Sequence, residues 1–172
     1  IYENTRALEI KENLVITNRG NITANNIVVA THYPIMNAPG YYFMKMHQER
    51  SYVIALENAD NVNGMYIDVE KNGCSFRNYK DLLLLGAIDQ RTGENEKGGC
   101  YDKLRKIAKD LYPNSKEKYH WSAQDCMTID KIPYIGKYSD KTPNIYVATG
   151  FNKWGMTSSM VSAMIISDMI LD

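Results

Sequence analysis

The sequence has no excess of charge of either sign, few cysteines and few phenylalanines. Its 172 residues carry 20 basic and 20 acidic side chains, so the formal net charge is zero. This balance argues against a protein that binds nucleic acid or a membrane surface by bulk electrostatic attraction. The length is sufficient for one good hydrophobic core or two small ones.

The number and spacing of the cysteines argue against a disulfide framework and against a zinc site. Cys74, Cys100 and Cys126 lie far apart, and an odd, widely spaced set is neither a disulfide framework nor a zinc motif. His47 and His120 show no metal-ligand spacing with a cysteine or a carboxylate. We therefore expect reduced thiols, no metal site and a cytoplasmic location.

A long hydrophobic run and an N-terminal start signal are also missing. The apolar stretch near the C-terminus contains Ser162, Ser167 and Asp168, which makes it too polar to span a bilayer. The chain starts at Ile1 with no initiator Met and no signal peptide. We expect a fragment of a longer protein.

The most informative stretch is residues 144–172. Residues 145–148 form a short apolar run with the composition of a buried strand, and a glycine-bearing turn follows. From Thr157 onward, apolar residues recur at helical spacing: Met160, Val161, Met164, Ile165, Met169 and Ile170. We expect a largely buried helix that is capped by Thr157 or Ser158. Because a helix start presents free N–H groups, the unit can receive an electron-rich group.

A second strand repeats the first part of this pattern. Residues 1–35 read as short strands, and the last of them, 27–30, is apolar and runs into Ala-Thr, as residues 145–149 do. We expect the two strands to be neighbours in one sheet. Ligands of open α/β sheets bind at the carboxyl ends of such strands.

The middle of the chain has a different character. Residues 41–90 read as successive strands without intervening helices, which favours an antiparallel sheet. An amphipathic helix is expected over 101–112, with Leu104, Ile107, Ala108 and Leu111 on its apolar side, and a strand over 116–128. The predicted fold class is α+β. Residues 1–36 and 140–172 would form one domain, and residues 37–139 an inserted antiparallel sheet domain with a flanking helix.

Several motifs together resemble a known family. They are Trp-Ser-Ala-Gln-Asp at 121–125, Ala-Thr-Gly-Phe at 148–151, Trp-Gly-Met-Thr at 154–157 and the strand at 27–34. Their order is similar to that of FAD-dependent oxidoreductases of the D-amino-acid oxidase, glycine oxidase and sarcosine oxidase type. A bacterial branch with an appended Rieske iron–sulfur domain is the most similar. The resemblance implies that the chain ends form a partial, Rossmann-like FAD-binding domain and that the insert is a substrate domain.

Two signatures of that branch are absent. No G-x-G-x-x-G follows a first strand, so the dinucleotide fingerprint is missing. No Cys-x-His and Cys-x-x-His pair is present, so a Rieske 2Fe-2S cluster would belong downstream and not to this chain. We expect FAD in the full-length parent and none bound by the fragment alone.

The resemblance assigns candidate residues to the cofactor site. In related oxidases the last strand–turn–helix passes the flavin, which implies this set here: Ala30, Thr31, Gly150, Phe151, Asn152, Lys153, Trp154, Gly155, Met156 and Thr157. The alternative is a close-packed turn that needs glycine for steric reasons only. His32 is a weaker candidate for a base, because a hydrogen-bonding histidine before a proline is more usual.

No catalytic residue is certain, and three are candidates: Lys153, Arg77 and Tyr52. An arginine and a tyrosine often hold the substrate carboxylate in this group of oxidases. Arg50 is a further possible carboxylate ligand, although surface strand arginines are common. Trp121 and Gln124 could line the site, while Asp130 could simply cap a turn.

The first functional hypothesis is a flavoprotein oxidoreductase part that oxidises a C–N bond of an amine or amino acid by hydride transfer to FAD. Its partners would be a small amine or amino-acid substrate and the missing N-terminal FAD-binding half. The alternative is a non-catalytic binding or oligomerisation module whose sheet domain docks on a partner, and a homo-oligomer is possible in either case. The fragment alone is expected to be inactive.

Overall fold

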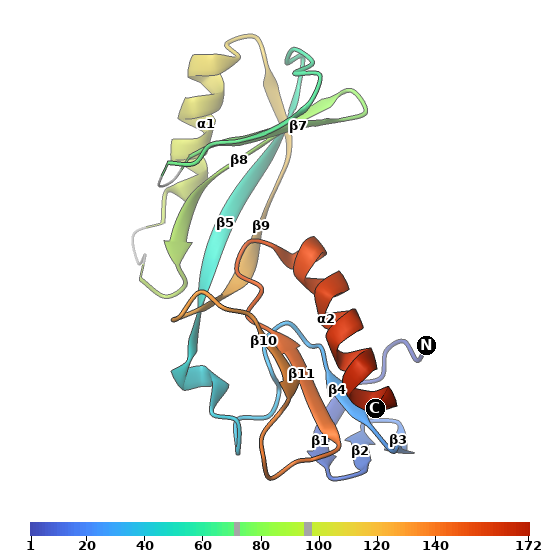
Figure 1. The fold of residues 1–172 in the computed structure, drawn as a ribbon. Coiled ribbons are helices and arrows are strands. Elements are labelled where there is room, and N and C mark those ends of the chain that lie inside the picture. Colours follow the sequence, from blue (N-terminus) through green and yellow to red (C-terminus); the bar gives the residue numbers. More distant parts are fainter. Residues whose placement is uncertain (71–72, 95–97) are drawn as a thin grey trace. The chain divides into compact units, whose positions relative to one another are not determined.

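The protein is described by a computed structural model that covers residues 1–70, 73–94 and 98–172 and contains two compact units (Figure 1). Unit 1 comprises Ile1–His47 and Cys126–Asp172, and unit 2 comprises Gln48–Asp125. Unit 1 is larger than the predicted domain of residues 1–36 and 140–172, because it also includes residues 37–47 and 126–139. The reason is that Tyr42, Met46 and Tyr138 share one buried cluster with the strands of unit 1. The roles of the two units stay predictions.

Unit 1 is built on a three-stranded sheet. Its strands are β10 (Tyr134–Lys137), β11 (Ile145–Thr149) and β4 (Ile27–Val29), in the order β10-β11-β4. β11 runs antiparallel to β10 and parallel to β4, with Ile145 opposite Ile27. The prediction that the two strands running into Ala-Thr are neighbours is confirmed.

The larger buried cluster of unit 1 lies on one face of this sheet, and a smaller one with Tyr146, Ala148 and Ile166 lies on the face that α2 covers. Ile27 and Val29 are buried whereas Val28 is 45% exposed, because successive residues of a strand point to opposite faces. The short 3₁₀ helix η1 (Tyr42–Met44) contributes Tyr42, whose hydroxyl donates to the Tyr138 carbonyl oxygen at 3.0 Å. The two tyrosine rings lie 5.0 Å apart.

A separate meander precedes β4. Its strands β1 (Ala7–Lys11), β2 (Leu14–Thr17) and β3 (Gly20–Thr23) pair antiparallel in chain order. Ile10 and Val15 pack against the buried cluster of unit 1. The predicted short strands of the first 35 residues are therefore present.

Helix α2 (Gly155–Leu171) forms where helical spacing predicted it, but two expectations were wrong. Its N-cap is Trp154 and makes no side-chain capping hydrogen bond, so neither Thr157 nor Ser158 caps it. The helix is also mostly exposed, because it packs on β10 and β11 through a narrow stripe that buries Ser162 and Ile166. Met160 and Met164 are 67% and 66% exposed.

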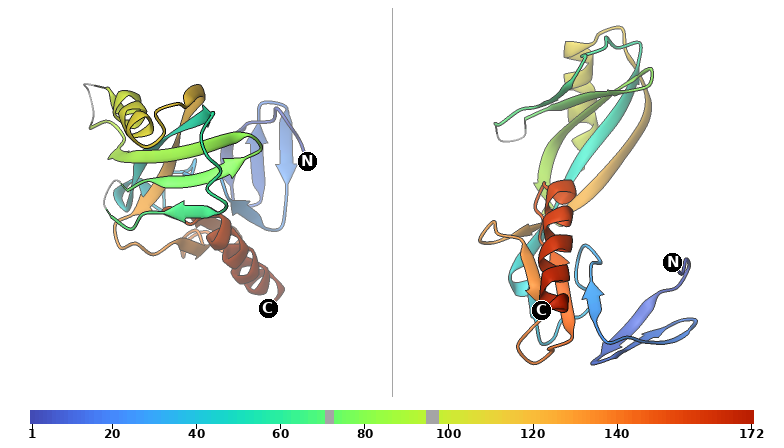
Figure 2. Two further views of the ribbon diagram at one scale, coloured as in Figure 1. Left: turned by 90° about the horizontal axis from the view of Figure 1, so that it is seen from above. Right: turned by 45° about the vertical axis from the view of Figure 1, so that its right-hand side comes forward.

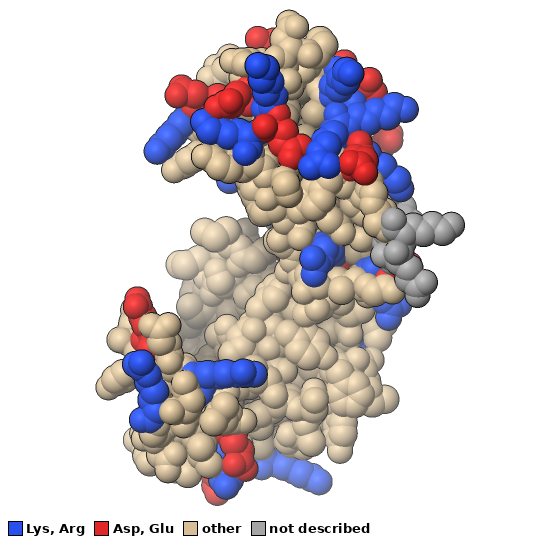
Figure 3. Space-filling view, turned by 180° about the vertical axis from the view of Figure 1, so that it is seen from behind, with Lys and Arg blue, Asp and Glu red and all other residues tan. Residues whose placement is uncertain are grey.

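Few charges accompany this exposed apolar surface. In α2 the only charged side chain is that of Asp168. Figure 3 shows Lys, Arg, Asp and Glu crowded over unit 2 and sparse over much of unit 1 on the face drawn. No helix in the described ranges is long and apolar enough to cross a membrane.

Unit 2 contains most of a five-stranded sheet with the order β6-β7-β8-β5-β9. The strands are β5 (Met46–Glu57), β6 (Met65–Ile67), β7 (Ser75–Tyr79), β8 (Leu82–Arg91) and β9 (Lys116–Thr128). The pairs β5–β8, β6–β7 and β7–β8 are antiparallel, which confirms the predicted antiparallel sheet. Residues 91–99 are rich in glycine and charge, which predicts an exposed loop. Residues 95–97 of this stretch lie outside the described residues.

Helix α1 (Cys100–Leu111) covers one face of this sheet (Figure 2). Leu104 and Ala108 are buried against Ile54, Leu83 and Leu85. Leu111, expected on the apolar side, is 53% exposed because the contact with the sheet ends one turn earlier. Among the described residues of unit 2, no other helix covers the opposite face.

Candidate cofactor site at the strand ends of unit 1

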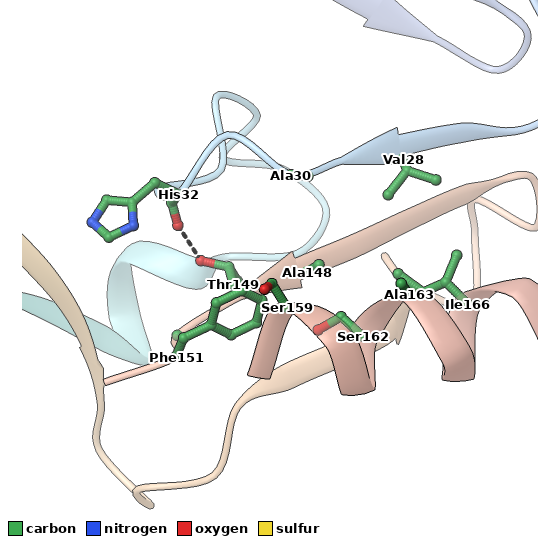
Figure 4. A pocket seen from close by; sticks show the side chains of 11 residues that line it. Val28, Ala30, His32, Ala148, Thr149, Phe151, Ser159, Ser162, Ala163 and Ile166 are labelled. Carbon is green, nitrogen blue, oxygen red and sulfur yellow. Dashed lines mark hydrogen bonds between the residues drawn. The ribbon is translucent and has the colours of Figure 1, made fainter. Parts of the chain in front are cut away.

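A pocket of about 380 Å³ lies where β4 and β11 end beside α2 (Figure 4). Val28, Ala30 and His32 line it from β4 and the residues that follow. The end of β11 and its turn contribute residues 148–151. Helix α2 contributes Ser159, Ser162, Ala163 and Ile166. The parallel pairing of β4 and β11 places both carboxyl ends at this one edge, as ligand sites of α/β sheets require.

Most side chains that line the pocket are small or apolar, and none is an Asp, Glu, Lys or Arg. The Ser159 hydroxyl donates to the Met156 carbonyl oxygen at 2.8 Å, and the Ser162 hydroxyl donates to the Ser158 carbonyl oxygen at 2.7 Å. Their protons are therefore used within α2, and only oxygen lone pairs remain available. Such walls suit a flat, largely uncharged body and not a phosphate.

A hydrogen bond joins the two strand ends. Thr149, which is 2% exposed, donates its hydroxyl proton to the His32 carbonyl oxygen. His32 has a left-handed backbone with φ of 64°. Its ring points away from the Ala163 and Ile166 end of the pocket (Figure 4), so the backbone of His32 shapes the site more than its imidazole does.

Gly150 has a steric reason to be glycine. Its φ is +69°, and a Cβ on it would lie 2.3 Å from Cγ2 of Thr128. The Asn152 side chain holds the same turn, since it accepts from the Thr128 N–H at 3.1 Å and donates to the carbonyl oxygens of Gly150 and Lys131 at 3.2 and 3.3 Å. Asn152 therefore stabilises this turn without lining the pocket itself.

The predicted cofactor residues divide into three groups. Ala30, Gly150 and Phe151 line the pocket. Thr31 and Asn152 do not line it, and Thr31 donates its hydroxyl proton to the Tyr33 carbonyl oxygen at 2.8 Å. The rest form the exposed start of α2 and the residues before it: Lys153, Trp154, Gly155, Met156 and Thr157.

The start of α2 presents backbone donors. The Trp154 N–H bonds to the Phe151 carbonyl oxygen at 2.9 Å, and the Ser158 N–H bonds to the Trp154 carbonyl oxygen at 2.9 Å. The N–H groups between them belong to the first turn, whose donors have no intrahelical acceptor. They carry the positive end of the helix dipole.

Sequence reasoning missed several lining residues. Val28, Ser159, Ser162 and Ala163 were not among the candidate cofactor residues. The available signal was the run of small residues at positions 159, 162 and 163, which share one face of a helix. Small residues on a helix allow close approach of a neighbouring group.

In unit 2 the structure does not bring Tyr52 and Arg77 together. Residues that pair across antiparallel strands share a face, and faces alternate along a strand. Arg77 pairs with Leu84, which pairs with Ala55, and Tyr52 lies three residues from Ala55 along β5. The two candidates therefore lie on opposite faces of the sheet and cannot clamp one carboxylate.

Tyr52 belongs to the face covered by α1. Gln90 Nε2 donates to its hydroxyl oxygen at 2.7 Å, and its ring meets the Tyr101 ring edge-on at 5.0 Å. Burial is the main reason why the pKa of Tyr52 is raised, and its hydrogen bond with Cys100 adds to the shift. Tyr52 is thus part of an internal network.

The remaining candidate residues are Arg50, Gln124, Trp121 and Asp130. Arg50 donates to Ser122 Oγ at 3.2 Å, and Gln124 donates to Thr92 Oγ1 at 3.0 Å. Trp121 is 41% exposed. Asp130 accepts from the Ile132 N–H at 3.1 Å, so it caps its turn as the alternative reading proposed.

Comparison with known proteins agrees with this architecture. The family model for FAD dependent oxidoreductases matches residues 1–169. A protein of Bacillus subtilis (strain 168), named as a Rieske 2Fe-2S iron-sulfur protein, YhfW, is 37% identical over 180 residues, which cover 99% of this chain and 35% of that protein.

Solved structures share the fold. Glycine oxidase from Geobacillus kaustophilus superposes with a TM-score of 0.79 at 20% identity, covering 98% of this chain and 48% of that one. L-Proline dehydrogenase from P. horikoshii has a TM-score of 0.74 at 18% identity, covering 96% and 50%. The chain thus spans about half of these enzymes and about a third of the Bacillus relative. With a family model matched along nearly its whole length, the chain belongs to the FAD-dependent oxidoreductases of the DAO family.

Proposed function

We propose that the chain is part of a flavoprotein that oxidises a C–N bond of an amine or amino acid by hydride transfer to FAD. The observation that carries the proposal is the pocket at the carboxyl ends of β4 and β11, beside the start of α2, in a member of an FAD-dependent family. The names glycine oxidase and L-proline dehydrogenase support the substrate class. The Rieske name of the Bacillus relative supports an iron–sulfur electron acceptor.

The residues present fit one part of FAD. A pocket of about 380 Å³ whose lining is mostly small or apolar, without Asp, Glu, Lys or Arg, suits part of a flat ring system. Ala30, Gly150 and Phe151 would contact the flavin, and the free N–H groups at the start of α2 would stabilise negative charge that develops on it. When bound, the flavin supplies the redox chemistry, and the protein orients substrate and tunes the ring.

The pyrophosphate of FAD needs a site that residues 1–172 do not provide, because no dinucleotide fingerprint is present. In the described chain β4 pairs with β11 on one edge and with no strand on its other edge. Parallel strands are normally covered and extended by neighbours. We infer that an N-terminal FAD-binding half pairs with this edge and covers the exposed methionines of α2.

Lys153 is the remaining catalytic candidate in unit 1. It lies in the exposed turn before α2, beside the free N–H groups. A lysine there would add positive charge near reduced flavin. Arg77 is the remaining candidate in unit 2 for holding a substrate carboxylate.

Two purified proteins test the proposal. The longer parent protein should be yellow, with a flavin absorbance band, and a colourless parent would overturn the assignment. The 172-residue chain should bind no FAD, and tight, saturable binding in an FAD titration would contradict that expectation.

A matched pair of α2 variants tests the site itself. Ala163→Phe fills the pocket from an exposed helical position and should lower the flavin content of the parent. Ser167→Phe adds the same ring to an exposed position of α2 that does not line the pocket, and it should leave flavin content unchanged. Equal flavin content in both variants would place the cofactor elsewhere.

The second candidate function is a non-catalytic binding or oligomerisation module. The exposed apolar surface of α2 favours it. A colourless parent that self-associates through α2 would support this function over the first one.

A further inference from the structure

Asn152 lies in the turn between β11 and α2 and is not among the residues that line the pocket of unit 1. We propose that Asn152 is a positioning residue, which fixes the backbone of this turn and thereby sets the reduction potential of the flavin in the pocket. The role toward flavin rests on the proposed function, whereas the effect on the turn does not. Asn152 acts through the backbone and does not touch cofactor or substrate.

The Asn152 side chain uses both ends of its amide group. Its Oδ1 accepts from the Thr128 N–H at 3.1 Å, and its Nδ2 donates to the carbonyl oxygens of Lys131 and Gly150 at 3.3 and 3.2 Å. Backbone groups from the end of β9, from the turn after β9 and from the turn after β11 therefore meet at one side chain. An amide offers an acceptor and two donors at once, whereas an ionised carboxylate offers acceptors only.

The backbone of Asn152 adds a fourth contact. Its N–H donates to the Cys126 carbonyl oxygen at 3.1 Å, so side chain and backbone together bind two alternate residues at the end of β9. Asn152 has a left-handed backbone with φ of 51°. Asparagine is several-fold enriched in this conformation among residues other than glycine. The residue type therefore suits both the backbone and the hydrogen bonds.

The turn lies tightly against the end of β9. Thr128 is 3% exposed, and a Cβ on Gly150 would lie 2.3 Å from its Cγ2. Close packing thus prevents the turn from moving toward β9, and the hydrogen bonds of Asn152 prevent it from moving away. Gly150 and Phe151, which line the pocket, are held in place by both effects.

The fixed turn leads directly into α2. Only two residues separate Asn152 from Gly155, where the helix begins. The free N–H groups of the first helical turn are therefore positioned by the same hydrogen bonds. Electrostatic stabilisation depends on donors that are in place before the charge develops. Movement of these donors would change how strongly reduced flavin is stabilised relative to oxidised flavin.

The simpler interpretation is that Asn152 serves stability alone. Asparagine side chains often bond to neighbouring backbone groups in turns. A purely structural residue would change the stability of unit 1 and leave the flavin potential unaltered. The two roles are therefore separable by measurement.

Amide hydrogen exchange of the 172-residue chain tests the effect on the turn. Asn152→Gly removes the side chain and keeps a residue that tolerates the left-handed backbone. The Thr128 amide then loses its acceptor. Its exchange should accelerate at least tenfold more than that of the Val147 amide, which lies in the central strand β11 and reports global opening. Equal acceleration at both amides would overturn the inference.

The reduction potential of the longer parent protein tests the effect on flavin. In Asn152→Gly we expect reduced flavin to be stabilised about tenfold less relative to oxidised flavin, which lowers the two-electron potential by about 30 mV. Asn58→Gly is the matched control. Asn58 also has a left-handed backbone, with φ of 57°, and its side chain makes no hydrogen bond within residues 1–70, 73–94 and 98–172. This control should leave the potential unchanged.

Asn152→His is the second variant, for the case that glycine weakens flavin binding too far. Histidine also tolerates the left-handed backbone, and its Nδ1 can accept from the Thr128 N–H. At about pH 8.5 a histidine with an ordinary pKa is neutral. We expect the Thr128 amide to regain protection and the potential to fall by less than in Asn152→Gly.

Two further outcomes would overturn the inference. Equal potentials in Asn152→Gly and wild type would make Asn152 a structural residue only, and equal shifts in Asn152→Gly and Asn58→Gly would make the effect unspecific. A colourless parent would refute the proposed function and with it the role toward flavin, while the exchange result for the turn would remain valid.

Discussion

The Thr149 hydroxyl donates a hydrogen bond to the carbonyl oxygen of His32. This bond joins the ends of two parallel strands from opposite ends of the chain, at the mouth of the pocket in unit 1. Its partners are a buried side chain and a backbone in a left-handed conformation. The bond therefore fixes a backbone path that side-chain packing alone does not dictate.

Thr149→Val should destabilise unit 1 by about 1–2 kcal/mol, because the shape is kept and one buried hydrogen bond is lost. Urea unfolding, followed by Trp154 fluorescence in a Trp121→Phe background, measures the change. Thr23→Val, at an exposed position of β3, is the control. Equal effects of the two substitutions would show that the bond contributes nothing.

Gly150→Ala should cost roughly 2–4 kcal/mol, since it combines a left-handed backbone with a clash against Thr128. Gly98→Ala has nearly the same φ, +68°, and open space, so it isolates the backbone cost of about 1 kcal/mol. Adding Thr128→Ser removes the clashing methyl group and should restore part of the loss. If Thr128→Ser restores none of the lost stability, the clash in Gly150→Ala must be relieved by movement of neighbouring residues instead.

The buried tyrosines predict a weakness at alkaline pH. Burial raises the pKa of Tyr42 to about 12, and the neighbouring Tyr138 and Tyr134 add to the shift. In the unfolded chain the Tyr42 hydroxyl ionises near pH 10. The stability that comes from keeping this hydroxyl protonated in the folded protein is therefore fully present below pH 10 and is lost as the pH rises toward 12. Tyr42→Phe should flatten the fall of the unfolding free energy over this interval.

The control for this experiment is Tyr2→Phe, which removes a tyrosine that is 80% exposed. It should keep the wild-type slope between pH 10 and 12. Identical slopes for all three proteins would mean that Tyr42 ionises in the folded state as readily as in the unfolded chain.

The exposed face of α2 predicts self-association of the 172-residue chain. Met160→Glu combined with Met164→Glu should weaken it by about tenfold or more, because burying a methionine is worth about 1.5–3 kcal/mol. Stability should change little, since both side chains already face solvent. Sedimentation equilibrium measures the association. Ser167→Glu adds charge at another exposed position of α2, and a similar loss in this variant would point to charge alone.

The sequence predicted the elements better than their environments. The shared Ala-Thr ending located the parallel pair of β4 and β11, and helical spacing located α2. Helical spacing cannot say what covers a helix, so the exposure of Met160 and Met164 was missed. Trp154 as the N-cap has no propensity signal, because no side chain makes the cap.

The candidate sites show the same division. Gly150 and Phe151, which line the pocket, were named as candidates from a strand–turn–helix pattern, and such a pattern is local. The opposite faces of Tyr52 and Arg77 depend on the registers of β5, β7 and β8, which long-range pairing decides. A shift of one residue would have put both on one face, and no local pattern specifies the register.

The insertion of residues 48–125 between the two halves of unit 1 has a consequence for folding. Unit 2 is contiguous and can fold as soon as it has been synthesised, whereas β4 must wait for β11, which follows all the other described strands. Closing so long a loop is slow and entropically costly unless the inserted unit has already become compact. Fast, independent folding of residues 48–125 would therefore set the rate at which the strand ends of unit 1 can meet.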